Sequence, residues 1–236
     1  MIDRTWREDR FVNVLVVDVG GTNVKLLASG ETQPRRYPSG SEMTPREMVR
    51  KAKEAAADWK FDVVAMGYPG FVRHGRIAIE PHNLAPGWIG FDFEAAFGCP
   101  VKILNDAAMQ ALGSYSSGFL LFVGLGTGLG SALVDEGVIV PMELGHLSYR
   151  KREIEDYVGA RGLARLGKKR WQKHVNRLIE RLTEVFHPDD IVIGGGNAKR
   201  LLETPAGCRI GDNAHAFTGG FRLWSAATAV DGARQI

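Results

Sequence analysis

Short apolar runs that end at glycine or at a polar residue recur along the chain, a pattern typical of buried strands joined by tight turns. Between these runs lie stretches whose apolar positions have helical spacing. In the first half, the pattern predicts strands over residues 11–18, 23–28, 62–66, 76–79 and 101–104, and helices over residues 44–59 and 107–116. A loop rich in proline, asparagine, glycine and tryptophan is expected over residues 81–91.

The second half repeats this alternation. It predicts strands over residues 119–123, 131–135 and 191–193, an amphipathic helix over 171–186, a helix from about 198, a loop over 205–212 and a last helix near 220–230. Strands and helices that alternate twice predict an α/β chain with two similar halves. We expect ligands at the carboxyl ends of the strands, where such folds bind them.

The composition indicates that the fold needs neither a disulfide nor a structural metal site for stability. A chain of 236 residues buries most of its apolar surface, and its two cysteines, Cys99 and Cys208, lack the spacing of zinc ligands. The first ten residues mix acidic and basic side chains, and no apolar stretch approaches the ~18 residues of a membrane helix. We therefore expect a cytoplasmic protein with no membrane partner.

The charge is distributed unevenly, although the formal net charge is only +3. Residues 150–181 contain 11 lysines and arginines against 4 acidic residues, a local excess of 11 − 4 = 7 positive charges. A surface of this kind attracts polyanions. A solvated helix face explains the same excess, and the sequence leaves both interpretations open.

The first motif that suggests chemistry is a glycine turn after the first predicted strand. Adjacent Gly20 and Gly21 allow backbone N–H groups to approach a phosphate without a Cβ clash. Thr22 adds a hydroxyl donor and Lys25 a positive charge. Asp18 can hold Mg²⁺ through water, because Mg²⁺ prefers oxygen ligands and keeps several waters. The alternative is a plain glycine hairpin beside a surface aspartate.

Two further glycine turns have the same potential. A run of four alternating glycines between two predicted strands exceeds what a hairpin needs, and Gly126, Thr127 and Gly128 form its centre. Gly195 and Gly196 lie between a strand and a helix, where N–H groups and a helix dipole favour an anion or nucleotide. A flexible turn and a plain strand–helix connection are the respective alternatives.

Five polar residues could act on a substrate. Asp106 follows a predicted strand and is a candidate general base for a hydroxyl that attacks phosphorus, help that is typically worth ~10²–10⁴-fold. A helix N-cap is the alternative for Asp106 and for Asn105 before it. Glu143, His146 and Glu155 offer the paired hydrogen bonds that sugars require, although a lone histidine is more often structural.

Together and in this order, the motifs resemble those of the ROK family of sugar kinases and regulators, from about Val14 to about Ala227. Residues 18–25 and 126–130 are similar to its two phosphate motifs, and residues 194–196 to its adenosine motif. The other matching segments are Gly67-Tyr68-Pro69-Gly70, Asn83-Leu84-Ala85-Pro86-Gly87-Trp88, Asn105-Asp106-Ala107, Glu143-Leu144-Gly145-His146 and Glu155-Asp156-Tyr157.

The resemblance implies an actin/hexokinase-type, ribonuclease H-like fold of two α/β lobes. The first lobe would be residues 1–104, with a C-terminal helix over 220–236 packing back on it, and the second 105–219. Asp106 would deprotonate the sugar 6-hydroxyl. The sugar would be held by Asn83, Asn105, Asp106, Glu143, His146 and Glu155. The donor phosphates and Mg²⁺ would be surrounded by Asp18, Gly20, Gly21, Thr22, Lys25, Gly126, Thr127, Gly128, Gly195 and Gly196.

The sequence departs from the family pattern in one segment. Many members carry a zinc-binding Cys-x-Cys-x-x-x-x-Cys cluster after the Glu-x-Gly-His motif, whereas residues 147–154 contain no cysteine, so we expect no zinc. The missing cluster, the short chain and Tyr157-Val158-Gly159 resemble the polyphosphate glucokinase branch of the family. Only 236 − 196 = 40 residues follow Gly196, and a trimmed nucleotide pocket would favour polyphosphate over ATP.

We therefore expect a hexose kinase that moves a phosphoryl group from polyphosphate or ATP to glucose with the help of Mg²⁺. Mannose, N-acetylmannosamine and fructose are alternative sugars. A non-catalytic sugar- or polyphosphate-binding protein is the alternative class, and Asp18 and Asp106 argue against it because a binder needs neither a metal ligand nor a base. We expect no nucleic-acid partner, since no N-terminal helix-turn-helix is present. A homodimer is one expected assembly, because relatives are often dimers.

Overall fold

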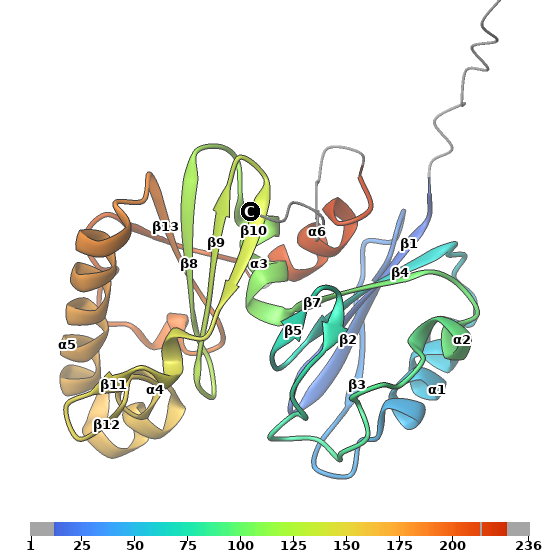
Figure 1. Cartoon of the computed structure of the whole chain (residues 1–236), viewed down its shortest axis with the longest axis horizontal. Coiled ribbons are helices and arrows are strands. Elements are labelled where there is room, and N and C mark those ends of the chain that lie inside the picture. The colour runs from blue at the N-terminus through green and yellow to red at the C-terminus, as the bar shows by residue number, and fades with distance from the viewer. Residues whose placement is uncertain (1–11, 213, 226–236) are drawn as a thin grey trace, which may run out of the picture.

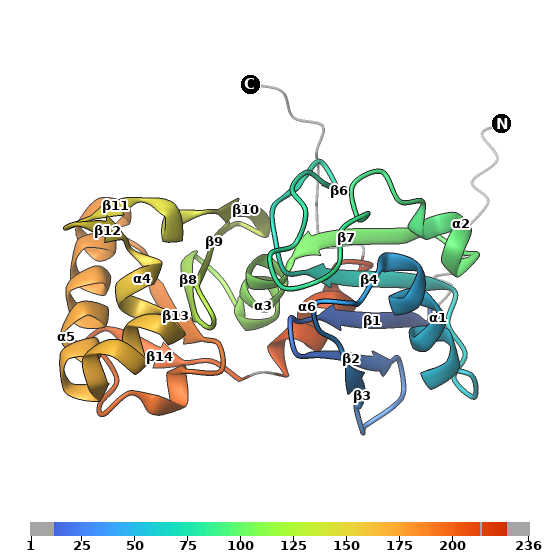
Figure 2. The same ribbon diagram turned by 90° about the horizontal axis from the view of Figure 1, so that it is seen from below.

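The computed structural model describes residues 12–212 and 214–225. Two five-stranded sheets lie side by side, and helices cover their faces (Figures 1 and 2). The α/β class that the sequence predicts is therefore confirmed. Within the described residues, no helix combines the length and apolar character that a membrane span requires.

The first sheet has the strand order β3-β2-β1-β4-β7. The strands β1 and β2 form an antiparallel hairpin that β3 extends, whereas β4 and β7 run parallel to β1. A small hairpin, β5 (Val72–Arg73) and β6 (Arg76–Ile77), follows β4. The strands of the sheet are β1 (Val14–Val19), β2 (Asn23–Ala28), β3 (Arg35–Pro38), β4 (Val63–Tyr68) and β7 (Val101–Asn105).

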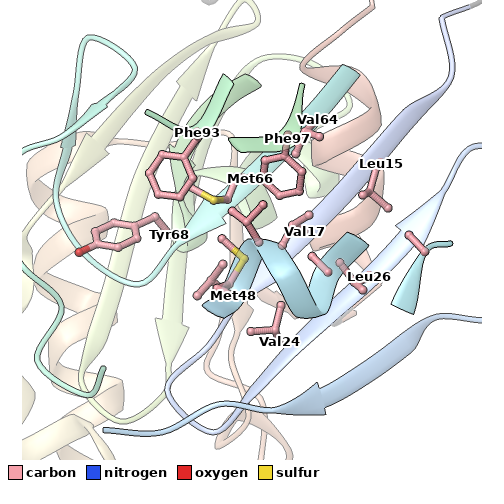
Figure 3. Close-up of a cluster of buried hydrophobic side chains, with 14 of the residues drawn as sticks. Leu15, Val17, Val24, Leu26, Met48, Val64, Met66, Tyr68, Phe93 and Phe97 are labelled. Carbon is pink, nitrogen blue, oxygen red and sulfur yellow. The ribbon is translucent and has the colours of Figure 1, made fainter. Parts of the chain in front are cut away.

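Because helices cover both faces of this sheet, β1 is buried along its whole length. Leu15 and Val17 point to one face, where they pack with α1 (Pro45–Ala55) and α2 (Phe93–Phe97), as Figure 3 shows. The alternate residues Val14 and Val16 point to the other face. There they pack with α3 (Asp106–Ser114) and α6 (His215–Arg222).

The second sheet repeats the same arrangement, with the order β10-β9-β8-β13-β14. One face packs against α5 (Ala160–Phe186), and the other packs against the alanines of α3, which therefore contacts both sheets. The strands are β8 (Phe119–Leu125), β9 (Leu129–Asp135), β10 (Val138–Met142), β13 (Asp190–Gly194) and β14 (Cys208–Ile210). Short elements complete this half: β11 (Ser148–Tyr149), β12 (Arg152–Glu153), α4 (Glu155–Val158), and 3₁₀ turns at Leu144–His146 and Ala198–Arg200.

The structure corrects several predicted elements. The amphipathic helix begins at Ala160 rather than at 171, and its pattern is interrupted at Gly167, which has a left-handed φ of 72°. The helix expected from about 198 is a single 3₁₀ turn, and the loop expected over 205–212 contains β14. The last helix begins at His215 and ends at Arg222, and residues 226–236 of the predicted segment lie outside the described residues.

Candidate active site

The first glycine turn connects β1 to β2 at the carboxyl end of β1. The amide of Gly20 donates to the carbonyl oxygen of Asn23 (3.0 Å), and a Cβ on Gly20 would lie only 2.9 Å from that oxygen, so the turn requires glycine. Asp18 is buried beside the turn, and Lys25 lies opposite it on β2. The Lys25 ammonium is 3.1 Å from Asp18 Oδ2, which places a cation and a carboxylate at the mouth of the turn.

Asn83 comes from a distant loop but packs directly on this turn. A Cβ on Gly21 would lie 3.0 Å from the Cβ of Asn83, so the missing side chain makes room for the asparagine. Glu80, which the sequence analysis missed, and Trp88, the last residue of the motif that begins at Asn83, shape the loop. The carboxylate of Glu80 accepts backbone hydrogen bonds from residues 87–89, and the buried Trp88 donates its indole N–H to Ala85 (2.8 Å).

Asp106 is the first residue of α3, directly after β7. The carbonyl oxygen of the Asn105 side chain caps this helix by accepting the amides of residues 107 and 108, and its amide donates to Gly70 (3.0 Å). Gly67 separates Asp106 from Asp18: a Cβ on Gly67 would lie 3.6 Å from Asp18 Oδ1 and 3.8 Å from the Cα of Asp106. The two aspartates therefore lie near each other, on either side of one glycine.

The electrostatics single out Asp106 among the acidic residues of the site. Burial by the surrounding protein raises the pKa of Asp106 to about 7, and repulsion from Asp18 and Glu143 adds to the shift. The side chain still keeps part of its surface open to solvent. A carboxylate that is half protonated near neutral pH and remains accessible has the properties of a general base.

The second glycine turn connects β8 to β9, and Glu155 packs against it. The amide of Gly126 donates to the carbonyl oxygen of Gly128 (3.2 Å), which closes a tight loop with Thr127 exposed at its tip. A Cβ on Gly128 would collide with a carboxylate oxygen of Glu155, and a Cβ on Gly145 would lie 3.4 Å from the same oxygen. Glu155 therefore links this turn to the segment of Glu143 and His146.

The third glycine turn lies against the second. Gly195 has a left-handed φ of 82°, and a Cβ there would come within 2.5 Å of the Leu125 carbonyl oxygen. Asn197 fastens the two turns together, because its side-chain amide donates to Gly126 (2.8 Å) and its backbone amide to Leu125 (2.8 Å). The sequence analysis did not assign this role to Asn197.

His146 has a partner that the sequence analysis missed. Its Nδ1 lies 3.1 Å from Glu153 Oε2, and Glu153 is held on β12 by pairing with β11. This hydrogen bond is the main cause of the raised pKa of His146. Burial, partly offset by His146, raises the pKa of Glu143. The hydrogen bond to Glu153 leaves the second ring nitrogen of His146 for a ligand.

Two places in the site have the chemistry of a cation site. Asp18 offers a hard carboxylate oxygen near Asp106, and repulsion between the two acids contributes to the raised pKa of Asp106. A divalent cation bound at Asp18 would relieve this repulsion. His146, Glu153 and Glu155 also bring one ligand atom each to within 4.8 Å of one another. The predicted absence of zinc stays a prediction.

A wide groove lies elsewhere in the described part of the chain. Its volume is about 1250 Å³, and the edge strands β7 and β10 and the β5–β6 hairpin line it. None of the predicted site residues is in its lining. The three glycine turns, Asn105 and Asp106 instead follow the ends of β1, β7, β8 and β13, as the rule for ligands at strand carboxyl ends anticipates. Asn83 comes from the loop after β6, and Glu143, His146 and Glu155 come from the segment after β10.

Comparison with known proteins identifies the family of this chain. The sequence matches the model of the ROK family over residues 14–162. Polyphosphate glucokinase of Mycobacterium tuberculosis is 28% identical over 211 residues, which covers 78% of this chain and 77% of that relative. A polyphosphate glucokinase of Mycobacterium leprae is 28% identical over 205 residues, 79% of this chain and 60% of that one.

Solved structures share the fold. Inorganic polyphosphate/ATP-glucomannokinase from Arthrobacter sp. strain KM has a TM-score of 0.77 at 24% identity, over 90% of this chain and 98% of that one. ROK hexokinase from Thermus thermophilus has a TM-score of 0.67 at 21% identity, and the match covers 88% of this chain and 96% of that one. The predicted actin/hexokinase-type fold is therefore confirmed. Because the family model spans more than half of the sequence, the chain belongs to the ROK family.

Proposed function

We propose that this sugar kinase transfers the terminal phosphoryl group of polyphosphate or ATP to the 6-hydroxyl of glucose, with Asp106 as the general base. The observation that carries the proposal is the position of Asp106. It stands at the start of α3, lies near Asp18 on the other side of Gly67, and has a pKa of about 7. A protein that only binds sugar needs no carboxylate with these properties.

In the proposed reaction, Asp106 accepts the proton of the sugar hydroxyl as its oxygen attacks the terminal phosphorus. One O–P bond forms and the bridging O–P bond breaks, so ADP or a polyphosphate shorter by one unit leaves. Amides of the turns at Gly20–Gly21 and Gly126–Gly128, together with Lys25, would hold the donor phosphates. Asp18 would hold Mg²⁺ through water, and the ion would neutralise charge on the transferred group.

The sugar would bind between Asn83 on one side and Glu143, His146 and Glu155 on the other. Each of these side chains offers a hydrogen-bonding group to a hydroxyl. Asn105 would contribute less directly, because its carbonyl oxygen already caps α3 and one amide hydrogen already binds Gly70. We propose that lobes 1–104 and 105–219 close over the sugar and exclude water, which would otherwise compete for the phosphoryl group.

Product formation tests the proposal directly. Purified protein is incubated with Mg²⁺ and glucose, in parallel with ATP and with polyphosphate, and glucose 6-phosphate is measured. Mannose, fructose and N-acetylmannosamine in the same assay identify the preferred sugar, and EDTA tests the need for a divalent cation. Absence of phosphorylated product from every sugar with both donors would contradict the proposal.

The pH dependence of kcat/KM is expected to follow Asp106. A base whose pKa is raised to about 7 is protonated and inactive below that pH, so kcat/KM should rise with pH through about 7 and level off above it. Asp18→Asn removes a repulsive charge and should move the rise to lower pH, in addition to slowing the reaction. A flat profile from about pH 5.5 to about pH 8.5 would exclude a base with this pKa.

Glu153 is expected to position His146 rather than to touch the sugar. Glu153→Gln weakens the hydrogen bond to Nδ1 and removes the charge that raises the pKa of His146. We expect the KM for glucose to rise about fivefold with kcat nearly unchanged, as is typical for an exposed pair worth about 1 kcal/mol. Steady-state kinetics with varied glucose measure this. Glu136→Gln, a matched change at an exposed turn residue, should leave both constants unchanged.

A further inference from the structure

One side of α5 carries a row of cations that the proposed reaction does not use. Arg170, Lys173 and Arg177 are exposed, and their spacing places them on the same side of the helix. The opposite side is apolar and packs into the core of the second half. Its buried members are Trp171, Val175, Leu178, Ile179 and Leu182.

A groove of about 510 Å³ runs beside this row. Arg150 borders it from the turn between β11 and β12, and Glu180 is the single carboxylate in its lining. No acidic side chain among residues 12–212 and 214–225 lies within ion-pair distance of Arg150, Arg170, Lys173 or Arg177. Four cations therefore share one groove without a carboxylate partner among the described residues, an arrangement that is repulsive until an anion binds.

The buried Tyr149 contacts His174, which lines this groove. The hydroxyl of Tyr149 lies 3.1 Å from His174 Nδ1, and the guanidinium groups of Arg150 and Arg181 lie 5.9 and 5.5 Å from the centre of the Tyr149 ring. Burial, followed by the charges of the neighbouring arginines, lowers the pKa of His174. The positive charge of the groove thus comes from arginine and lysine, which stay ionised at neutral pH.

A line of contacts connects the groove to the second glycine turn. The first amide of α5, at Ala160, donates to the carbonyl oxygens of Gly126 and Thr127 (3.0 and 3.1 Å). Arg161 follows, 3.9 Å from the Asp156 carboxylate. Arg165 then donates to the backbone of Asp156 (2.8 Å) and lies over the Tyr157 ring, which contacts His174 in the groove. Figure 2 shows α4 beside α5 on this side of the molecule.

We propose that the α5 groove binds the distal part of a long polyphosphate chain while the end of that chain occupies the transfer site. This inference rests on the proposed function. Polyphosphate carries one evenly repeated charge along its length, which suits a row of arginines able to form paired hydrogen bonds with phosphate oxygens. The break at Gly167 lets the second part of α5 pack back on α4, where the indole of Trp171 donates to the carbonyl oxygen of Val158 (2.7 Å). None of the residues that line the groove belongs to the glycine turns proposed to hold the donor phosphates, so the groove is separate from the transfer site.

The test compares two triple variants with equal loss of charge. Arg170→Gln, Lys173→Gln and Arg177→Gln remove the row on α5, whereas Arg46→Gln, Lys60→Gln and Arg73→Gln remove three exposed cations from the first half. Equal thermal midpoints establish that both variants fold. Binding of fluorescent long-chain polyphosphate is measured without sugar, and KM is measured for long-chain polyphosphate, tripolyphosphate and ATP.

We expect the α5 variant to bind long-chain polyphosphate on the order of tenfold more weakly, with a matching rise in its KM. Its KM values for tripolyphosphate and ATP should stay within about twofold of the wild-type values. The plot of log binding constant for polyphosphate against log salt concentration should become less steep by about 2. The control variant should match the wild type. Unchanged binding in the α5 variant would overturn the inference, as would equally tight wild-type binding of single-stranded DNA of the same charge. Because binding needs no turnover, this result does not depend on which sugar is phosphorylated.

Discussion

Asp106→Asn is expected to lower kcat by about 10²–10⁴-fold while glucose binding changes only a few-fold. Asparagine has the same shape, and its side-chain oxygen can still accept the amide of Ala107, as Asp106 does now (2.7 Å). What the variant loses is the ability to take a proton from the attacking hydroxyl. Initial rates of glucose 6-phosphate formation measure the first effect, and calorimetric titration with glucose measures the second.

Asp92→Asn is the matched control for this experiment. Asp92 also stands at a helix N-terminus, where it caps α2 by accepting the amide of Ala95 (2.9 Å), but it lies outside the site. The same chemical change there should leave kcat unchanged. If Asp106→Asn retained wild-type activity, Asp106 could not be the base, and its raised pKa would have no part in the reaction.

Gly113→Ala is expected to lower the free energy of unfolding by about 3 kcal/mol, the upper part of the range for overpacked cores. Gly113 on α3 faces the backbone of α6, and a Cβ there would overlap the carbonyl oxygen of His215. Gly219 on α6 makes the reciprocal contact with the carbonyl oxygen of Met109. The two helices can relieve the overlap only by moving apart, because both partners are backbone atoms.

Urea unfolding followed by circular dichroism measures this loss. Gly196→Ala serves as the control, since a Cβ at Gly196 meets nothing within 4 Å and should cost little stability. Gly219→Ala should destabilise to a similar degree, and the double variant should lose less than the sum, because one separation of the helices relieves both overlaps. A fully additive double variant would show that the two glycines act independently.

The elements that the sequence predicted well are those whose pattern depends on burial alone. Strand β1 is apolar along its length because helices cover both of its faces, so its pattern is unambiguous. Strand β3 was missed because it is an edge strand with the sequence Arg35-Arg36-Tyr37-Pro38, in which exposed and half-buried residues alternate. The early start of α5 was missed because Gly167 interrupts the helical pattern.

In the candidate site, too, some features could be predicted from the sequence and others could not. Glycine turns can be found in a sequence because close backbone contacts exclude other residues, as at Gly20 and Gly128. Side chains that hold other side chains leave no such signal. Glu153 is one of many glutamates until the hairpin places it beside His146, and Asn197 becomes notable only when its amide reaches Gly126. The repulsion that raises the pKa of Asp106 likewise depends on strands far apart in the chain.

The position of α6 has a consequence for how the protein is made. Phe217 and Leu223, near the end of the chain, pack against Val14 and Val16 in its first strand. A ribosome releases the amino-terminal half first, and domains usually fold in that order as they emerge. Here α3 covers part of one apolar face of the first sheet, and the rest stays exposed until residues 217–223, about 200 residues after β1, have been synthesised. During that interval the nascent chain presents apolar surface of the kind that chaperones shield, so the yield of folded protein is expected to depend on them.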